Sequence, residues 1–484
     1  MIFADLLFLT GFLPLFFVAY YLTPQRFKNI VALAGSLIFY AWGAPIFVFV
    51  LAASVTTDFF LSHQIEKAKA TPNGSPKLWM SIFLVLNLGL LAYFKYVNFF
   101  VADLNEFLSW MGNSPVSWVN IALPFGISFF TFQKLSYGLD VYRGERPAAK
   151  RFLDYFLYVV LFPQLVMGPI VRYKEIEAQI QDRTQNETWE YRLAGLWRFI
   201  IGLSRKVLIA NPIGIVVDQI FALPEAQLST STAWIGLFAF AFYIYFDFSG
   251  YADMAIGLGK MMGFRLPENF RSPYIARSIT EFWQRWHITL GAWFRDYLYR
   301  SVRGKRNAKG QRSRTMLSLW AVFLLMALWH GASWSWILWG VYNGLFITLE
   351  RKFFADQIKK WPRFPFLVYG FGITLLGMVM FKLQNLSQIT HFYATLFGGG
   401  AEKQNLLVLG IRLDAKFWFL MAIAAVFSFA GAIPQVEKWQ QKLLDLKLGS
   451  SQIIIATVLA LGLLLLCFAE LSAFGFKPFL YADF

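Results

Sequence analysis

Two of the four histidines in this chain lie close together in sequence, and they are the side chains best suited to chemistry. His287 ends the run Glu281-Phe-Trp-Gln-Arg-Trp-His287, and His330 lies within Leu328-Trp-His330-Gly-Ala-Ser-Trp334. A neutral imidazole can accept a proton near pH 7, because its unperturbed pKa is ~6.5. His330 follows an apolar run of membrane length, where an ionisable side chain is expensive and marks a functional site by default. We therefore expect His330 to act as a base. His287 taken alone is more typical of an interfacial histidine with a satisfied hydrogen bond.

A second group of polar side chains lies within the apolar stretch 232–262. Asp247 and Tyr251 share one helix face at a spacing of four residues, and Asp253 lies on a neighbouring face. Two carboxylates within a membrane span should face a polar interior. They could line a site, or they could form structural pairs with Arg265, Arg271 or Arg277. The residues alone leave both interpretations open.

The elements that carry these side chains are membrane helices. The chain has 484 residues, of which 57% are hydrophobic and 15% are charged, against about 25% charged in soluble proteins. Twelve apolar runs can be recognised, and about 20 residues suffice to cross a bilayer as a helix. The expected fold is therefore an all-α polytopic membrane protein with about 11–12 transmembrane helices. The first run has no basic segment before it and no cleavage site, so we interpret it as a retained helix.

Three stretches should build a site instead of a simple span. Residues 152–171 contain two prolines and a glycine, and residues 278–294 are flanked by arginines, so both are candidate re-entrant or interfacial segments. Residues 315–350 should form a helical hairpin with His330 deep in the membrane near its turn. For the two histidines to act together, the segment that carries His287 must dip towards this hairpin.

The positive charge of the chain is concentrated in loops. The formal net charge is +16, and basic loops between apolar runs are typical of cytoplasmic loops, not of nucleic-acid binding. The densest tract lies between the two histidines and contains the three candidate donor-docking residues Arg303, Lys305 and Arg306. It could simply set topology beside anionic lipid, or it could dock an anionic cytoplasmic donor. These two roles are compatible.

The absence of several catalytic and binding motifs from the sequence disfavours other activities. The chain has no Gly-x-Ser-x-Gly elbow, no His-Glu-x-x-His pair, no Walker A motif and no metal-ligand spacing. The sequence Gly257-Leu-Gly259-Lys-Met-Met-Gly263 misses the dinucleotide fingerprint and lies on an apolar run, so we attribute it to close helix packing. The longest loop, 384–416, is too short for a folded catalytic domain. We therefore expect no bound metal or cofactor.

The motifs resemble the membrane-bound O-acyltransferase (MBOAT) family, in particular its bacterial branch with the alginate O-acetyltransferase membrane subunit. The resemblance rests on residues 277–299, on Trp329-His330-Gly331-Ala-Ser-Trp334, on residues 247–259, on Pro267-Glu-Asn-Phe270 and on Gly168-Pro-Ile-Val-Arg-Tyr173. It implies helices around a central tunnel, with N-terminal membrane helices at 1–118, a catalytic core at 119–384 and C-terminal membrane helices at 385–484. It also implies His330 as the essential histidine and His287 as the second active-site position. Further tunnel-lining or substrate-contacting candidates are Asp247, Tyr251, Asp253, Trp283, Trp329, Trp334 and Asn343.

The implied activity is the movement of an acyl group, by preference acetyl, from a cytoplasmic thioester across the membrane toward hydroxyls of an extracytoplasmic polysaccharide. The donor would be acyl-CoA or an acyl carrier protein, and the partner an extracytoplasmic acetyltransferase- or esterase-like protein. The location would be the bacterial inner membrane. His330 would deprotonate the acceptor or carry the acyl group as a relay. Residues 300–306 read Arg-Ser-Val-Arg-Gly-Lys-Arg and depart from the family pattern, which leaves the donor open. The alternatives are D-alanyl-type or lipid-directed acyl transfer, and a transporter or channel.

Overall fold

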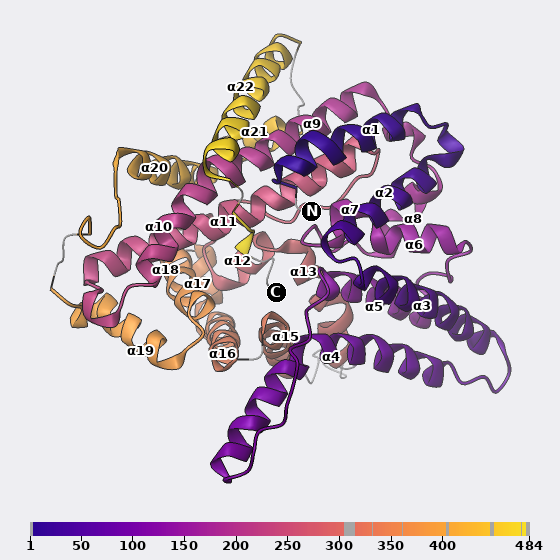
Figure 1. The fold of residues 1–484 in the computed structure, drawn as a ribbon, viewed down its shortest axis with the longest axis horizontal. Coiled ribbons are helices and arrows are strands. Elements are labelled where there is room, and N and C mark those ends of the chain that lie inside the picture. The colour runs from indigo at the N-terminus through magenta and orange to yellow at the C-terminus, as the bar shows by residue number, and fades with distance from the viewer. Residues whose placement is uncertain are drawn as a thin grey trace. The chain divides into compact units, whose positions relative to one another are not determined.

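The computed structural model describes residues 3–303, 315–331, 333–360, 362–402, 406–445, 450–475 and 477–480, and these are helical with connecting loops (Figure 1). Within this part of the chain the only extended pairing is an isolated bridge between Ser229 and Ala401. The chain divides into two compact units, Met1–Asn186 with Phe264–Leu266, and Glu187–Gly263 with Pro267–Asp483. Both histidines of interest belong to the second unit.

The first unit contains eight α-helices among its described residues. They are α1 (Leu13–Leu22), α2 (Lys28–Gly43), α3 (Phe47–Ala70), α4 (Pro76–Trp110), α5 (Ile127–Arg143), α6 (Phe152–Val160), α7 (Phe162–Leu165) and α8 (Tyr173–Gln181). The break expected in 152–171 is present, because α6 ends at Val160 and α7 carries Pro163 in its first turn. A buried pair between Lys134 Nζ and Asp58 Oδ2, 3.1 Å apart, joins α5 to α3.

The second unit contains the remaining α-helices. They are α9 (Trp189–Ser204), α10 (Asn211–Phe221), α11 (Thr230–Met261), α12 (Ile279–Arg285), α13 (Ile288–Trp293), α14 (Arg300–Val302), α15 (Thr315–His330), α16 (Trp334–Leu349), α17 (Ala355–Lys360), α18 (Arg363–Lys382), α19 (Leu386–Ala394), α20 (Ala415–Phe429), α21 (Pro434–Leu444) and α22 (Ser450–Phe474). A π-helical segment, Arg205–Ala210, joins α9 to α10, and another, Phe294–Tyr299, follows α13.

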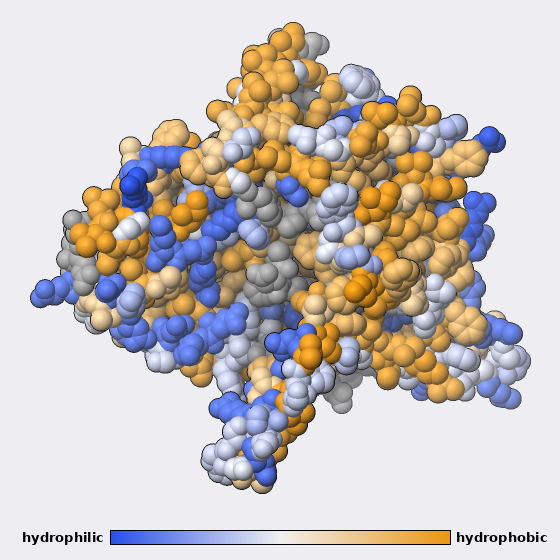
Figure 2. Space-filling model, in the orientation of Figure 1, coloured by the Kyte–Doolittle hydropathy of each residue, from blue (hydrophilic) through white to orange (hydrophobic). Residues whose placement is uncertain are grey.

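Seven helical stretches of the described chain are long and apolar enough to cross a membrane. They are Phe47–Ala70, Pro76–Trp110, Trp189–Phe221, Thr230–Met261, Arg363–Lys382, Ala415–Ala432 and Ile453–Phe474. The other five expected runs fold as shorter helices, at Phe8–Leu22, α2, α5, α15 and α16. Over α22 the surface is hydrophobic (Figure 2), and Ile454 and Leu465 are 67% and 71% exposed. The expected class, an all-helical polytopic membrane protein, is confirmed.

Glycines set the close crossing of α9 and α11, which run side by side (Figure 1). A Cβ on Gly202 would lie 2.5 Å from the carbonyl oxygen of Gly250, and one on Gly257 would lie 2.6 Å from that of Gly195. No real side chain fits at these distances, so the two backbones meet directly. Gly257 therefore serves close helix packing, as the sequence indicated, and α11 becomes the buried axis of the second unit.

Candidate active site

His330 is the last residue of α15, at the turn of the expected hairpin between α15 and α16. The two helices approach closely because Gly340 of α16 lies where a Cβ would meet Ala327 Cβ at 2.7 Å. His330 Nδ1 lies 2.8 Å from the carbonyl oxygen of Met326, one turn earlier. A carbonyl can only accept a hydrogen bond, so Nδ1 carries the proton and Nε2 carries the lone pair. The hairpin thus delivers an imidazole in the tautomer that a general base requires.

Aromatic rings surround His330, which is 4% exposed. The Trp336 ring stacks on the imidazole with the centroids 5.1 Å apart and the planes 18° apart. Trp329, Trp339 and Phe381 present edges, with centroids 4.7, 5.1 and 5.7 Å away. Such walls hold the ring in place and exclude water from the reacting groups.

His287 lies between α12 and α13, within the stretch 278–294 that the sequence indicated as re-entrant or interfacial. Its backbone is left-handed, with φ 45° and ψ 52°, a conformation that is uncommon for residues other than glycine. The geometry ends α12 and starts α13 in a new direction. Non-glycine residues in this region cluster at functional sites, where surrounding contacts enforce the conformation. Here those contacts come from Asn269.

Asn269 fixes the orientation of His287. Its side-chain oxygen lies 3.2 Å from His287 Nδ1 and accepts hydrogen bonds from Thr289 N at 3.2 Å and Thr289 Oγ1 at 2.9 Å. The amide cannot be flipped, because its NH₂ group would then face the Thr289 N–H. Nδ1 of His287 must therefore donate, which leaves the lone pair on Nε2, an atom with no hydrogen-bond partner among the described residues. Asn269 is fully buried.

The helix before His287 is anchored at both ends. Buried Glu350, at the end of α16, accepts hydrogen bonds from Thr280 N at 3.0 Å and Thr280 Oγ1 at 2.8 Å in the first turn of α12. In the last turn, Arg285 bridges Glu281 of its own helix and Glu437 of α21, at 2.9 and 2.8 Å. These contacts explain how a helix of seven residues can hold His287 in a strained conformation.

Burial and neighbouring charges also shift the pKa values of Glu281 and His287, in and after α12. This helix lies outside the seven candidate spans. Burial alone would raise the pKa of Glu281, but the Arg277 N–H and the Arg285 guanidinium hold it below its ordinary value. Burial lowers the pKa of His287, and the nearby His330 lowers it further. Glu281 is therefore held as a carboxylate and His287 as a neutral imidazole.

The two histidines line one cavity, which meets the geometric requirement stated from the sequence. The cavity has a volume of about 40 Å³, and α11, α12, α13, α15, α16 and α18 contribute to its walls. On this measure one water needs about 10–15 Å³, so the space admits a few small atoms and not a long chain. Both rings have their Nδ1 protons held by the protein. A Nε2 atom of these rings can therefore accept a proton from a small hydroxyl bound in the cavity.

Two of the other tunnel candidates line the cavity and the rest do not. The roles of all of them in a site stay predictions. Trp283 and Asn343 line the cavity and hydrogen-bond to each other, Nε1 to Oδ1, at 3.1 Å. Trp329 is buried beside both histidine rings. Trp334 follows the hairpin turn and is 69% exposed. Tyr251 is buried on α11, with the ring of Phe479 4.9 Å away.

Asp247 and Asp253 are held in ion pairs away from the residues that line the cavity. Asp253 binds Arg198, 2.6 Å away, and also Arg205. Asp247 Oδ1 pairs with Lys206 at 2.5 Å, and its Oδ2 accepts the backbone N–H of Leu480 at 2.8 Å. The structural pairing that the sequence left open is therefore present, but its partners come from α9 and the π-helical segment, not from Arg265, Arg271 or Arg277.

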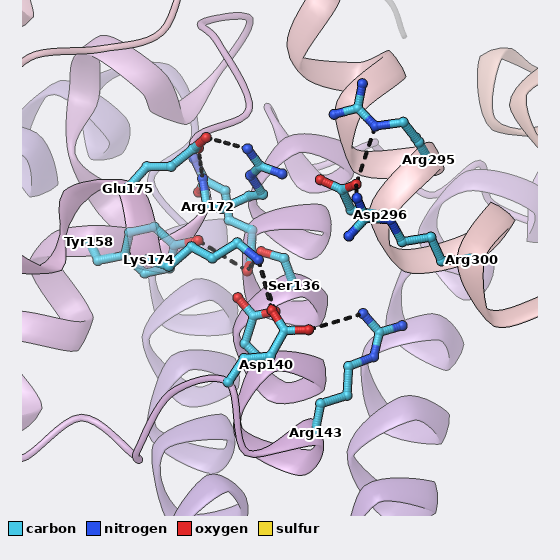
Figure 3. Close-up of polar contacts among 12 residues, drawn as sticks. Ser136, Asp140, Arg143, Tyr158, Arg172, Lys174, Glu175, Arg295, Asp296 and Arg300 are labelled. Carbon is cyan, nitrogen blue, oxygen red and sulfur yellow. Dashed lines mark hydrogen bonds and ion pairs between the residues drawn. The ribbon is translucent and has the colours of Figure 1, made fainter.

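The basic tract is described in part. Arg303 follows α14, with its guanidinium 5.4 Å from the centre of the Tyr299 ring. Lys305 and Arg306 lie outside the described residues. Before them, Arg295 and Arg300 share Asp296 at 3.2 and 3.3 Å while staying 61% and 65% exposed (Figure 3). Separately, in the first unit, Lys174 lies 3.7 Å from Asp140. The donor-docking role stays a prediction.

Three groups important to this geometry were not singled out from the sequence. The Met326 carbonyl is four residues from His330, so the helix period alone could have indicated it. Asn269 lies within the motif Pro267-Glu-Asn-Phe270, but no spacing rule predicts that it meets His287. Glu350 is the last residue of the expected hairpin 315–350, and no pattern there indicated that it would hold another helix. Among the described residues, no three His, Cys, Asp or Glu side chains gather as a metal ion would need.

Comparisons with known proteins show which family the chain is similar to. The family model described as MBOAT, membrane-bound O-acyltransferase family, matches residues 149–390, which include both histidines. A probable alginate O-acetylase of Azotobacter vinelandii is 37% identical over 508 residues, covering 100% of both chains. A peptidoglycan O-acetyltransferase of Helicobacter pylori is 34% identical, covering 78% of this chain and 76% of the relative. A teichoic acid D-alanyltransferase of Bacillus subtilis is 29% identical, over 50% of this chain and 62% of the relative.

Proposed function

Because this chain belongs to the membrane-bound O-acyltransferase family, we propose that it moves an acetyl group from a cytoplasmic thioester to hydroxyls of an extracytoplasmic polysaccharide. Membership makes the protein a membrane-bound O-acyltransferase and sets aside the transporter alternative. The choice of acetyl and of a polysaccharide is supported by the names of the relatives that cover most of the chain, an alginate O-acetylase and a peptidoglycan O-acetyltransferase. The D-alanyl-type relative covers only half of it.

One observation carries the mechanism: two imidazoles line one small cavity, each with Nδ1 bound to a protein oxygen acceptor. When the acceptor enters, the reacting hydroxyl donates its single hydrogen bond to His330 Nε2, while His287 Nε2 accepts from a neighbouring hydroxyl of the same acceptor and so orients it. His330 Nε2 then removes the proton as the hydroxyl oxygen attacks the thioester carbonyl. The tetrahedral intermediate collapses, the C–S bond breaks, and the imidazolium returns the proton to the departing thiolate. Aromatic walls keep water from competing for the thioester.

The remaining parts of the proposal rest on the family to which the chain belongs and on the charge of its loops. The donor is acyl-CoA or an acyl carrier protein thioester that docks at the basic tract around Arg303. An extracytoplasmic partner with acetyltransferase- or esterase-like chemistry completes the modification, and the protein resides in the bacterial inner membrane. Exposed Arg295 and Arg300 near the tract are consistent with binding of an anionic donor.

The test replaces His330 with alanine and measures acetyl transfer from labelled donor into polysaccharide in membrane vesicles. Loss of a positioned base lowers the rate by roughly 10²–10⁴-fold. The transfer rate of His330→Ala should therefore fall by that amount, while the variant still inserts normally into the membrane. His391→Ala is a matched control, because His391 is part-exposed on α19 and absent from the cavity lining. Full activity in His330→Ala would overturn the proposal.

A further inference from the structure

The cavity that holds the two imidazoles also contains an amide group. Asn343, on α16, lines this cavity and is 7% exposed. A buried amide is unfavourable unless it is hydrogen-bonded, and one that lines a reaction cavity can contact the atoms that react there. The proposed reaction uses both imidazoles but leaves this amide without a role.

Two partners fix the orientation of the Asn343 amide. Trp283 Nε1 can only donate, and it lies 3.1 Å from Asn343 Oδ1. The Trp339 carbonyl oxygen can only accept, and it lies 2.8 Å from Asn343 Nδ2. A flipped amide would place donor against donor and acceptor against acceptor. Both contacts therefore assign the same positions to the oxygen and the nitrogen.

One hydrogen of this NH₂ group remains available. An amide nitrogen carries two hydrogens, and Asn343 Nδ2 donates to one described residue, Trp339. Trp339 lies one helical turn nearer the hairpin turn, and its own ring is 5.1 Å from the His330 ring. The nitrogen therefore lies on the side of Asn343 nearer to His330. The hydrogen bond from Trp283 also polarises the amide and strengthens the remaining N–H as a donor.

The proposed reaction needs a donor that neither histidine can supply. As the hydroxyl oxygen bonds to the thioester carbon, the C=O π electrons move onto the carbonyl oxygen, which becomes an oxyanion. Both Nδ1 protons are held by protein oxygens, so both Nε2 atoms carry lone pairs. The proton that His330 takes up is needed by the departing thiolate. A preorganised N–H group at the oxyanion is typically worth about 10²–10³-fold in kcat.

The other polar groups on the cavity wall are less suited to this role. The hydroxyls of Tyr342 and Thr374 each donate to a backbone carbonyl oxygen at 2.8 Å. The rings of Trp286 and Trp339 each carry one indole N–H. An indole nitrogen accepts no hydrogen bond, so nothing polarises these donors as Trp283 polarises the amide. Asn343 is therefore the donor that this wall favours.

We propose that Asn343 forms the oxyanion site of this enzyme, donating its second Nδ2–H to the acyl carbonyl oxygen. The hydrogen bond strengthens as the oxygen gains charge, and it weakens again when the C–S bond breaks and the C=O bond re-forms. Because it is strongest at the tetrahedral intermediate, it raises kcat and leaves ground-state binding of the donor almost unchanged. The inference rests on the proposed function and deepens it, because it names a third group that touches the reacting atoms.

The test follows thiol release from acetyl-CoA by the full chain in lipid nanodiscs, together with acetyl transfer into polysaccharide. Asn343→Leu removes the donor at similar volume, so kcat should fall by about 10²–10³-fold. KM for acetyl-CoA should change by less than about threefold, because the lost interaction belongs to the transition state. The pH profile of kcat should keep its midpoints, since Asn343 does not titrate. Asn343→Ala carries the same predictions without added bulk and replaces Asn343→Leu if that variant does not insert.

Two controls separate hydrogen-bond donation from support of the fold. Trp283→Phe removes the hydrogen bond to Asn343 Oδ1 but keeps the Asn343 NH₂ group, so kcat should fall by less than about tenfold, the effect of one ordinary hydrogen bond. Asn385→Leu removes the N-cap of α19, outside the cavity lining. This second variant should lower the melting temperature without lowering kcat.

A kcat of Asn343→Leu within about threefold of the wild type would overturn the inference. An equal loss in Trp283→Phe or a shifted pH profile would do the same, because either would assign Asn343 a positioning role. A larger loss in Trp286→Phe or Trp339→Phe would place the oxyanion at an indole instead. If acetyl-CoA releases no thiol, an acetylated carrier protein serves as donor in the same measurements. Thiol release without acetylated polysaccharide would count against the proposed acceptor alone.

Discussion

Asn269 offers the sharpest test of the two-histidine geometry. Replacing it with leucine keeps a similar volume but removes the oxygen that accepts from His287 Nδ1 and from both donors of Thr289. The buried Nδ1–H then has no partner, at a cost of about 1–3 kcal/mol. The imidazole can escape this cost by moving its proton to Nε2, which abolishes the lone pair facing the reaction. We expect kcat to fall by roughly 10–100-fold, the equivalent of 1.4–2.7 kcal/mol.

The assay compares initial rates of acyl transfer in purified Asn269→Leu, His287→Ala and the double variant. If Asn269 acts through His287, the double variant should be no slower than His287→Ala, because the two changes remove one function. Thr289→Val is the matched control, since it removes one donor to Asn269 and leaves the bond to His287. Asn269→Asp keeps an acceptor and should restore activity in part, with a shifted pH profile.

Two results would refute the reasoning. If the rate losses of the two single variants multiply in the double variant, Asn269 does not act through His287. It would then support the fold or another step. An imidazole nitrogen spectrum in which His287 carries its proton on Nε2 in the wild type would contradict the tautomer directly. A lower melting temperature alone would decide nothing about the tautomer, so it is read only beside these measurements.

Three further predictions follow from the packing. Met378→Ala enlarges the small cavity, so the ratio of propionyl to acetyl transfer should rise; rates with the two thioesters measure it. Gly202→Ala places a methyl group 2.5 Å from the Gly250 carbonyl and should destabilise the protein by about 1–3 kcal/mol in thermal unfolding. Glu281→Gln should lower stability more at pH 7 than at pH 4, because the folded pKa of Glu281 lies below its unfolded value. Its contribution is then present above the unfolded pKa of ~4.3 and lost as pH falls through the folded pKa.

Each of these predictions can be contradicted by one result. An unchanged acyl preference in Met378→Ala would mean that the cavity wall does not select the chain. Gly462→Ala is the partner of Gly202→Ala, because a Cβ at Gly462 meets nothing within 4 Å, so equal losses would contradict the close-crossing argument. Equal destabilisation of Glu281→Gln at both pH values would show that its charge is not responsible.

The sequence by itself determined the class of the protein, its breaks and its hairpin, because these depend on local information. Apolar run length sets a membrane helix, as at 230–261, and prolines with a glycine mark a break, as at 152–171. The hairpin with His330 at its turn follows from Gly331 and Ser333 after an apolar run. Even the tautomer of His330 depends on a residue one turn away.

Only the tertiary structure decided which distant side chains meet. Asp253 pairs with arginines 48 and 55 residues away, and its partners depend on the crossing of α9 and α11 that the glycines permit. His287 depends on Asn269, and α12 depends on Glu350 at the end of another helix. Packing between helices chooses such partners, because many arginines satisfy the local pattern equally well. The histidines were recognisable as residues, but the shared cavity that makes them a site is a property of the fold.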